Sequence, residues 1–426
     1  MENNMMIQQK NEVITALIVG FFIRLAAFLV VFIALSDTTI SFLKGFHNWD
    51  SNNYLAICAH NYASPDTPYP HSLRLYAFYP ALPIVYCGLA KVLSANVLLV
   101  ALCMNTVFFL LLCKELHTYI YREYEDKNLR AYIFLCYLFF PFSWFLQVNY
   151  TETLFLWLTL LSINLIYSKK IWLSHLSGFF AGFTRSTAFA TAIGNWIIYT
   201  WKFFKTETSH SDMTEVTGEC ISYEAISSHK KTGKDIASYI LNSLGFLSYG
   251  MGTLCLLAYF QFAFGNWNLF FESQKVYFGR QTSLHFWQGW LDDLTMSSIK
   301  WFTWNDIWKV KMSGSDNVVD YLLTLQTFNT WFLLYFPLTL AFIGSVYLLY
   351  KKQYDKFIWS WLLLIMPIMT GESTSINRYL ILSFPLLFAV FELAAKNTVT
   401  KYAWLGFSVL AWAVVASWFA KDFWVG

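Results

Sequence analysis

Long apolar stretches separated by short polar segments set the pattern of this chain from end to end. A helix needs about 20 apolar residues to cross a hydrocarbon core of about 30 Å. The pattern therefore predicts an all-α polytopic membrane protein with about ten transmembrane helices, forming a single domain over residues 1–426. The apolar stretches are Val13–Leu35, Asn96–Cys113, Ala131–Gln147, Thr151–Tyr167, Ile171–Phe204, Ile236–Phe264, Thr330–Tyr350, Phe357–Met369, Tyr379–Ala395 and Tyr402–Ala420.

The distribution of basic residues predicts which side of the membrane each loop faces. Cytosolic loops carry an excess of Lys and Arg, and this places the loops with Lys127, Lys231 and Lys352 in the cytosol. The segments then predicted to lie outside are Asp50 and its loop, the Asn149–Glu152 turn, Gly265–Asp320 and Gly371–Asn377.

This orientation requires that two segments are not simple spans. Leu75–Leu93 contains Pro80 and Pro83, which each remove a backbone donor and restrict the preceding residue. We expect a re-entrant or interfacial helix there. Ile171–Phe204 must turn back on itself near Gly182–Arg185, and one tilted crossing is the alternative. The polar segment within residues 204–235 predicts a mobile cytosolic loop.

Composition supports this class and excludes others. Hydrophobic residues make up 57% of the 426 positions and charged residues only 13%, about half the charged fraction of a soluble domain. The net charge of +3 comes from basic residues scattered at span ends, so we expect membrane lipids and no nucleic acid as partners. The seven cysteines lack zinc-ligand spacing, and we interpret those in apolar runs, Cys87 included, as small core residues and not as a disulfide framework. Val13–Leu35 is too long for a signal-peptide core, so we expect an anchor.

The polar stretch Phe46–Pro83 is the first candidate for chemistry. A carboxylate beside apolar spans loses solvation unless water, a partner or a substrate meets it, and Asp50 is such a carboxylate. It is a candidate general base. The alternative is structural, because Asp50 could act as the N-cap of an interfacial helix. We also count Trp49 and Asn53 as substrate-binding candidates.

Three further charged residues are candidates. Glu152, beside Tyr150, could act on a substrate or could simply be stabilised by the dipole of the helix that it begins. Arg185 lies inside an apolar hairpin and needs an anion or an acidic partner. Arg378 could bind a phosphate through its planar fork, or extend to the interface as a snorkelling side chain.

The remaining polar residues carry weaker predictions. His60 and His71 could position a phosphate or a sugar, although loop histidines are mostly just solvated. Asp292 and Asp293 lie in an amphipathic stretch, so we predict no obligatory metal. The tryptophans of that stretch are typical of an interfacial belt and could also stack on sugar rings; they are Trp287, Trp290, Trp301, Trp304 and Trp308.

Several short motifs resemble one known family. Asn48-Trp49-Asp50 with Tyr54, then Ala77–Pro80 and Leu82-Pro83, is similar to the first extracytoplasmic loop of the PIG-V family, which comprises GPI mannosyltransferase 2 and its bacterial relatives. Asn48 departs from the His that GPI-pathway members often carry. Five blocks follow the family order: Trp49–Pro83, Pro141–Phe155, Gly178–Ser186, Gly265–Arg280 and Ser375–Pro385.

The resemblance implies a GT-C-like glycosyltransferase with a large first extracytoplasmic loop. It implies inverting transfer of mannose from a polyprenyl-phosphate donor to a glycolipid or lipid-linked glycan acceptor, like a GPI precursor, on the extracytoplasmic or lumenal side. Asp50 would be the general base, Glu152 a second catalytic residue, and Tyr150, Arg185 and Arg378 would bind substrate. No cofactor is expected, and a small membrane partner subunit is left open. The membrane would be the cell membrane in a bacterium and the endoplasmic reticulum membrane in a eukaryote.

Two other functional classes fit a polytopic chain. A flippase or transporter of lipid-linked sugars usually has inverted repeats and charged residues at the membrane midplane. The charged candidates here gather mostly at one predicted face, which favours chemistry at a surface. A structural subunit of a glycosylation complex would retain the spans but would not need Asp50.

Overall fold

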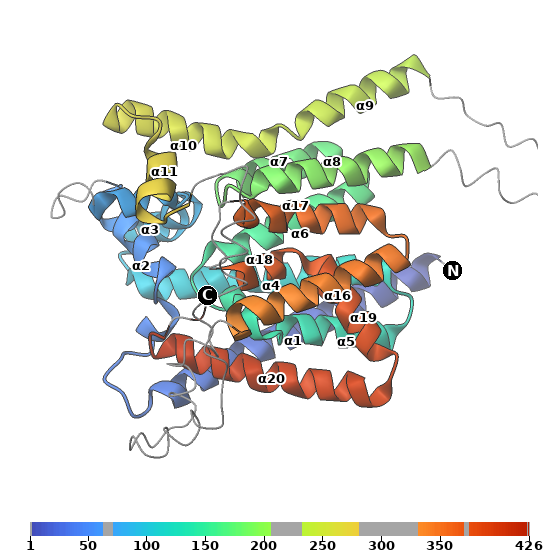
Figure 1. The fold of residues 1–426 in the computed structure, drawn as a ribbon, viewed down its shortest axis with the longest axis horizontal. Coiled ribbons are helices and arrows are strands. Elements are labelled where there is room, and N and C mark those ends of the chain that lie inside the picture. Colours follow the sequence, from blue (N-terminus) through green and yellow to red (C-terminus); the bar gives the residue numbers. More distant parts are fainter. Residues whose placement is uncertain are drawn as a thin grey trace, which may run out of the picture.

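The computed structural model describes residues 2–62, 71–205, 232–280, 331–369, 375–423 and 425. Within these ranges the ordered elements are helices and none is a β-strand. Most of the longer helices run along one common direction, horizontal in Figure 1, and form a bundle. The predicted all-α fold class is therefore confirmed.

The first part of the chain forms the following elements. They are α1 (Glu2–Leu35), the short 3₁₀-helix η1 (Lys44–Phe46), α2 (Asp50–His60), η2 (His71–Ala77), α3 (Ala81–Leu93), α4 (Val97–Glu123), α5 (Lys127–Leu138), η3 (Pro141–Leu146), α6 (Thr151–Tyr167), α7 (Ile171–Gly182) and α8 (Ala188–Lys205). Side-chain caps fix two of the starts, because Asn96 accepts from the first turn of α4 and Asp126 from that of α5.

The second part of the chain adds the remaining elements. They are α9 (Gly233–Gly245), α10 (Ser248–Phe264), α11 (Leu269–Glu272), the π-helical η5 (Ser273–Tyr277) and η6 (Trp331–Tyr335), α16 (Phe336–Tyr350), α17 (Tyr354–Ile368), α18 (Ile376–Leu382), α19 (Phe384–Ala395) and α20 (Thr398–Ala420). A capping box of Thr232 and Asp235 begins α9, and Gly265 ends α10 in a left-handed conformation (φ 72°).

The bundle has two distinct ends. At one end, on the left of Figure 1, lie α2, α3 and α11; we call it the Asp50 end. The N-terminus and α9 lie toward the other, where Glu12 of α1 pairs with Arg130 of α5; we call it the Glu12 end. Loops predicted to face the cytosol, at Lys127 and Lys352, belong to the Glu12 end, because Lys356 pairs there with Glu123. Lys231 lies outside the described residues, as do the tryptophans from Trp287 to Trp308 and Asp292–Asp293.

Several helices are long and apolar enough to cross a membrane. Among the described residues there are four: Lys10–Leu35, Val97–Glu123, Gly233–Phe264 and Thr398–Ala420. A fifth results if α18 and α19, which bend by 81° at their junction, count as one span. These helices support a membrane protein, but the predicted number of about ten spans is not confirmed. Other apolar helices, such as α6 with 17 residues, are shorter than the roughly 20 that a full crossing needs.

The segment Ile171–Phe204 forms two helices that turn back on each other. Its middle lies at the Asp50 end, where Arg185 contacts the beginning of α6 through Thr151. Its far end returns to the end of α6, where the Lys202 ammonium donates to the carbonyl of Tyr167 over 3.0 Å. The structure therefore has the predicted hairpin with its bend at residues 183–187, and each arm is short.

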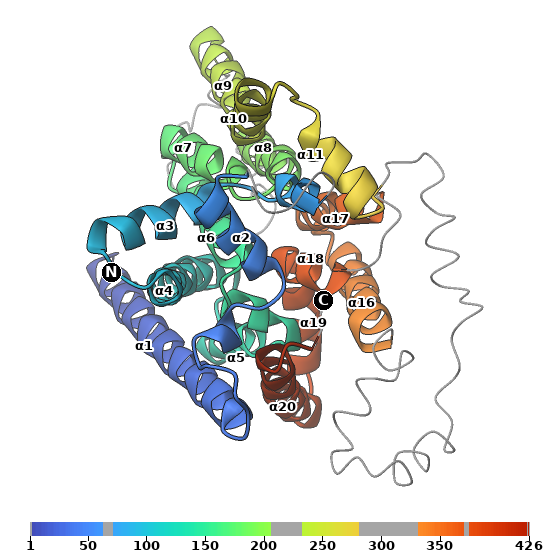
Figure 2. The same cartoon turned by 90° about the vertical axis from the view of Figure 1, so that its left-hand side faces the viewer.

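The proline-containing segment Leu75–Leu93 does not join the bundle direction. Helix α3 begins directly after Pro80, and its first residue donates to the carbonyl of Phe183 over 3.2 Å. In Figure 2, which views the Asp50 end, α3 lies across the end while α4 is seen nearly end-on. This orientation matches the expected re-entrant or interfacial helix.

Close packing and one buried polar network hold the hairpin in place. Helices α7 and α10 approach until Gly182 and Gly252 touch, with no room for a Cβ atom on either. Nearby, the Tyr249 hydroxyl contacts Ser162 and accepts from the Asn195 amide at 2.8 Å. Asn195 in turn accepts from the Trp359 indole at 3.0 Å. Because α6, α8, α10 and α17 meet at these groups, the network fixes the hairpin and hence the position of its bend.

The cysteine prediction was only partly right. Cys87 of α3 forms a disulfide with Cys58 of α2, with the two Cα atoms 5.8 Å apart. The bridge joins the two helices that cover the Asp50 end, and such bonds persist where the environment is oxidising. Sequence reasoning missed it because the partners are 29 residues apart and Cys58 lies in a polar stretch. Cys113 and Cys136 are buried free thiols, as expected, whereas Cys103 and Cys255 were also expected in the core and are exposed, because they lie on the outward faces of α4 and α10.

Candidate active site

Asp50 begins α2, but its carboxylate does not cap the helix. The N-cap is Trp49, whose backbone (φ 54°, ψ −114°) lies in a region that side chains rarely occupy. The Asp50 backbone N–H donates to the Tyr150 hydroxyl at 3.2 Å, and that hydroxyl donates to the carbonyl of Asn48 at 3.4 Å. The alternative interpretation of Asp50 as an N-cap is therefore wrong, and its carboxylate remains available for other contacts.

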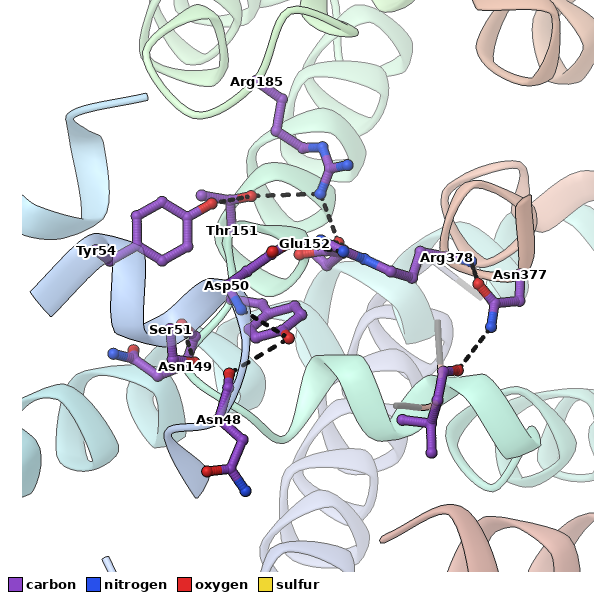
Figure 3. Close-up of polar contacts among 12 residues, drawn as sticks. Asn48, Asp50, Ser51, Tyr54, Asn149, Thr151, Glu152, Arg185, Asn377 and Arg378 are labelled. Carbon is purple, nitrogen blue, oxygen red and sulfur yellow. Dashed lines mark hydrogen bonds and ion pairs between the residues drawn. The ribbon is translucent and has the colours of Figure 1, made fainter. Parts of the chain in front are cut away.

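Arg378 connects the two carboxylates of the site (Figure 3). Its Nη1 lies 2.7 Å from Asp50 Oδ2, and its Nε and Nη2 lie 2.7 and 2.6 Å from Glu152 Oε1. The side chain is only 7% exposed, so it does not extend to water as a snorkelling arginine would. The preceding turn is unusual, since Ser375 has φ 140°, a value that favours glycine.

Glu152 is the buried centre of the cluster. It lies in the first turn of α6, its side chain is fully buried, and Arg185 Nη1 approaches its Oε1 to 2.6 Å. Nitrogen atoms of two arginines thus converge on one oxygen. The other oxygen, Oε2, is buried and has no hydrogen-bond partner among the described residues. A buried acceptor without a donor is costly, so a ligand hydroxyl or a water molecule is the natural partner for Oε2.

Arg185 approaches the cluster from the hairpin bend. Besides Glu152, its Nη1 donates to the Thr151 hydroxyl at 3.3 Å, which also accepts from the Tyr54 hydroxyl at 3.3 Å. Burial acts against the charged guanidinium, but the negative charge of Glu152 outweighs it and raises the pKa of Arg185 above its usual range. Arg185 is therefore a permanent cation held at the bend.

Aromatic rings line the arginines. The Arg378 guanidinium lies 4.7 Å from the Tyr150 ring centre and 5.3 Å from that of Phe145, and Arg185 lies 5.2 Å from the ring of Tyr379. Such faces attract cations and exclude water. Burial and then the charge of Asp50 raise the pKa of Tyr150, so this hydroxyl stays protonated and keeps donating to Asn48.

Charge and exposure together distinguish the two carboxylates. Two guanidiniums face two carboxylates, so the four-residue cluster is neutral overall. Glu152 is fully enclosed, whereas the Asp50 side chain remains 19% exposed. Asp50 is therefore the carboxylate that a molecule arriving at this end can reach.

A second set of contacts anchors the site to the C-terminal end of the chain. The Asn48 amide donates to the Phe419 carbonyl at 2.6 Å, and the Asn377 amide donates to the Val425 carbonyl at 2.9 Å. Ser51 donates to the carbonyl of Asn149 at 3.1 Å. Sequence reasoning did not single out these amides, because nothing local shows that Asn48 meets a carbonyl 371 positions away.

Arg24 is a buried residue that sequence reasoning missed. From α1 it donates to the backbone carbonyl of Gln147 and, at 3.0 Å each, to the Gln147 side chain and the Thr106 hydroxyl. The Asn105 amide holds the next carbonyl, that of Val148, at 2.8 Å. These contacts fix the turn that leads into Tyr150. A charge inside the apolar stretch was the available signal.

The other predicted residues lie around the cluster or away from it. Trp49 is 37% exposed beside Asp50. Asn53 is buried one turn along α2, and its Oδ1 has no partner in the described part of the chain. His60 is the last residue of α2, about 15 Å along the helix from Asp50, and His71 begins η2. No group of three or more metal-binding side chains occurs among the described residues.

Comparison with known proteins gives one distant likeness. The GPI mannosyltransferase 2 of Drosophila pseudoobscura pseudoobscura is 28% identical over 130 residues, which cover 28% of this chain and 27% of that protein. The chain therefore matches only about a quarter of its relative's length. No family model matches the sequence. This similarity identifies a mannosyltransferase-like relative at low identity.

Proposed function

We propose that this protein is a glycosyltransferase that moves a mannosyl residue from polyprenyl-phosphate mannose to a glycolipid or lipid-linked glycan at the extracytoplasmic face. The distant likeness to a mannosyltransferase supports the reaction class. The single observation that carries the proposal is the partly exposed Asp50 carboxylate, held by Arg378 against a fully buried Glu152.

Asp50 is the general base of this proposal. One of its carboxylate oxygens takes the proton of the acceptor hydroxyl, and the acceptor oxygen bonds to the anomeric carbon of mannose. The bond between that carbon and the donor phosphate oxygen breaks on the opposite side, and polyprenyl phosphate leaves with the electron pair. One attack from the opposite face inverts the anomeric centre, so no second nucleophile is needed.

Arg185 and Arg378 stabilise negative charge on the leaving phosphate. Both guanidiniums lie at the Asp50 end and are permanently charged. Their planar forks hold N–H groups in fixed directions, which suits bidentate contact with a phosphate. Glu152 keeps both arginines in place and, through Oε2, offers an acceptor to a substrate hydroxyl or to a water.

The contrasting proposal is a lipid-linked-sugar transporter. Transporters bind their cargo near the midplane, between repeats. The four charged residues of this cluster lie instead where α2, α6, α18 and the hairpin bend meet at the Asp50 end. This position favours surface chemistry over passage through the bundle.

Product formation is the test of the proposed function. The purified protein in detergent is given polyprenyl-phosphate mannose labelled at the anomeric carbon, together with candidate glycolipid acceptors. We expect a labelled glycolipid whose linkage, read by NMR, is inverted relative to the donor. Release of free mannose alone, or no product with any acceptor while the labelled lipid changes sides in proteoliposomes, would contradict it.

A further inference from the structure

A second group of basic residues lies at the Asp50 end, outside the four-residue cluster. Arg74 of η2 is half-buried, and its guanidinium lies 5.9 Å from the ring centre of Tyr277 in η5. Among the described residues no carboxylate lies within 4.0 Å of it. An arginine normally binds an acidic group or an anion when it loses water, so Arg74 is a candidate to bind an anionic ligand.

Arg280 lies on the same surface. Its guanidinium is 5.3 Å from the Phe278 ring and donates to the Gln274 side chain at 3.2 Å. The rings of Tyr277 and Phe278 contact each other with centres 4.9 Å apart. Arg74 and Arg280 therefore flank one pair of neighbouring rings. We call this surface, with exposed Lys275 on the same segment, the η2–η5 seam.

The η2–η5 seam is continuous with the candidate active site. The Phe278 ring contacts Phe78 at 6.1 Å, and Phe78 contacts Tyr54 at 5.3 Å. Tyr54 bonds to Thr151, the hydroxyl that Arg185 also contacts. Arg280 in addition lies close enough to act electrostatically on Tyr379, the ring beneath Arg185. Adjoining side chains therefore connect the seam to the cluster.

The surroundings of the seam are those of a membrane surface. Exposed apolar side chains accompany its basic residues on the segment after α10: Trp267 is 54% exposed, Phe271 48% and Val276 65%. Aromatic side chains mixed with Lys and Arg are typical of the headgroup level of a bilayer. A soluble anion would need the cations but would gain nothing from the apolar neighbours.

We infer that the η2–η5 seam binds the phosphate of a membrane lipid between Arg74 and Arg280. The central cluster is neutral, because its two arginines are matched by Asp50 and Glu152, whereas Arg74 has no acidic partner among the described residues and keeps its positive charge for an incoming phosphate. The phosphate belongs either to the polyprenyl chain that carries the sugar or to a bilayer phospholipid. The inference rests on the proposed function only in the choice of polyprenyl phosphate as the first probe.

Lipid binding to matched variants tests the site without any reaction. Wild type, Arg74→Gln, Arg74→Lys and Arg280→Gln are titrated in detergent with undecaprenyl phosphate, and with undecaprenol as the uncharged probe. The control is Arg122→Gln, since Arg122 also stacks on a tyrosine (3.6 Å to the Tyr167 ring) but at the Glu12 end. Thermal unfolding without lipid confirms that each variant is folded.

Loss of one charge-assisted contact should weaken undecaprenyl phosphate binding about tenfold in Arg74→Gln and in Arg280→Gln. Arg74→Lys should lose less affinity for undecaprenyl phosphate, and Arg122→Gln should lose none. Undecaprenol should bind all variants with the same affinity. Dioleoylphosphatidylglycerol, added as a competitor, identifies which lipid supplies the phosphate. If it displaces undecaprenyl phosphate from wild type but not from Arg74→Gln, the seam is assigned to bilayer phospholipid. If it does not displace undecaprenyl phosphate from wild type, the seam is assigned to the polyprenyl lipid. Unchanged binding of both charged lipids to folded Arg74→Gln and Arg280→Gln would overturn the inference.

The two proposals fail in different ways. A wild-type protein that binds undecaprenyl phosphate through Arg74 but forms no mannosylated product would retain the seam and reject the proposed function. An Arg74→Gln protein with unchanged lipid binding and unchanged transfer would reject the seam and retain the proposed function.

Discussion

The two ends of the bundle bury their charges in different ways. At the Glu12 end, Arg130 forms two bonds to Glu12, with one guanidinium nitrogen for each carboxylate oxygen (3.2 and 2.8 Å). It also donates to the carbonyls of Tyr124 and Glu125. At the Asp50 end, Arg378 and Arg185 share a single oxygen of Glu152, and the other oxygen lacks a partner among the described residues.

This difference separates a structural ion pair from a reactive site. The Glu12 pair holds α1 against α5, and each guanidinium nitrogen of Arg130 and each carboxylate oxygen of Glu12 has a partner. At the Asp50 end one acceptor remains unused, Asp50 is partly exposed, and backbone strain lies at Trp49 and Ser375, directly before the two helices that carry Asp50 and Arg378. Strain of this kind persists where the surroundings hold it and is concentrated at functional sites.

The largest effect is expected from removing a buried carboxylate at either end. Glu152→Gln leaves Arg185 without a negative partner, and breaking a buried pair in this way costs about 3–5 kcal/mol of unfolding free energy. Glu12→Gln should cost a similar amount through Arg130. Thermal unfolding in detergent measures both. A Glu152→Gln protein as stable as wild type would show that the cluster does not hold the Asp50 end together.

A smaller effect is expected where the hairpin is packed. Gly252→Ala places a methyl group against the backbone of Gly182, and overpacking of this kind costs about 1–3 kcal/mol. Because the hairpin bend carries Arg185, the rate of transfer from the donor should fall as well. Gly406→Ala is the matched control, since nothing lies within 4 Å of that position in α20, and it should be neutral or slightly stabilising. Equal stability of the two variants would argue against the close contact of α7 and α10.

Arginine-to-lysine exchange separates charge from geometry. Arg185→Lys keeps a cation but loses the planar fork, so we expect the KM for the donor to rise about tenfold, or about 1.4 kcal/mol, with the KM for the acceptor nearly unchanged. Arg130→Lys, the equivalent change at the Glu12 end, should lower stability without altering either KM. Initial rates at varied donor and acceptor concentrations measure this, and an unaltered donor KM in Arg185→Lys would return that residue to a structural role.

The smallest effect at neutral pH concerns His47, which is fully buried beside the site. Burial lowers its pKa from the usual 6.5 to about 4, and its Nδ1 hydrogen donates to the Leu43 carbonyl at 2.7 Å. Between these values the unfolded chain binds the proton and the folded one does not. The contribution of neutral His47 to the free energy of unfolding should therefore be fully present above about pH 6.5 and should be lost as the pH falls toward 4. A His47→Gln variant should lack this component of the pH dependence; a slope equal to that of wild type would contradict the assignment.

The sequence predicted the features that depend on short-range pattern. The hairpin was predicted because the loops rich in Lys and Arg must all lie on one side of the membrane. The transverse orientation of α3 was predicted from Pro80 and Pro83. Asp50, Glu152 and Arg378 were expected on one side, and they meet. Their ion pairs were not predicted, because contacts between residues 226 and 328 positions apart depend on the packing of α18 against α2 and α6.

Other features had weak or misleading signals. Arg24 was overlooked because the apolar stretch around it was evaluated as a whole. The predicted number of about ten spans is not confirmed, since hydropathy does not distinguish a full crossing from a short helix such as α7, with 12 residues. The Cys58–Cys87 bridge needed the positions of α2 and α3 in space.

The most direct test of the account exchanges one aspartate at each end for asparagine. Asp50→Asn keeps size and hydrogen-bonding reach but cannot accept the acceptor proton. Asp126→Asn makes the same change at the Glu12 end, where Asp126 caps α5 and asparagine caps equally well. Single-turnover transfer of labelled mannose at saturating donor is measured for both, with thermal unfolding as the control for folding. We expect Asp126→Asn to transfer at the wild-type rate, and Asp50→Asn to be folded, to bind donor and to be slower by about 10²–10⁴-fold. A folded Asp50→Asn protein with a rate near that of wild type would contradict the assignment of Asp50 as the general base.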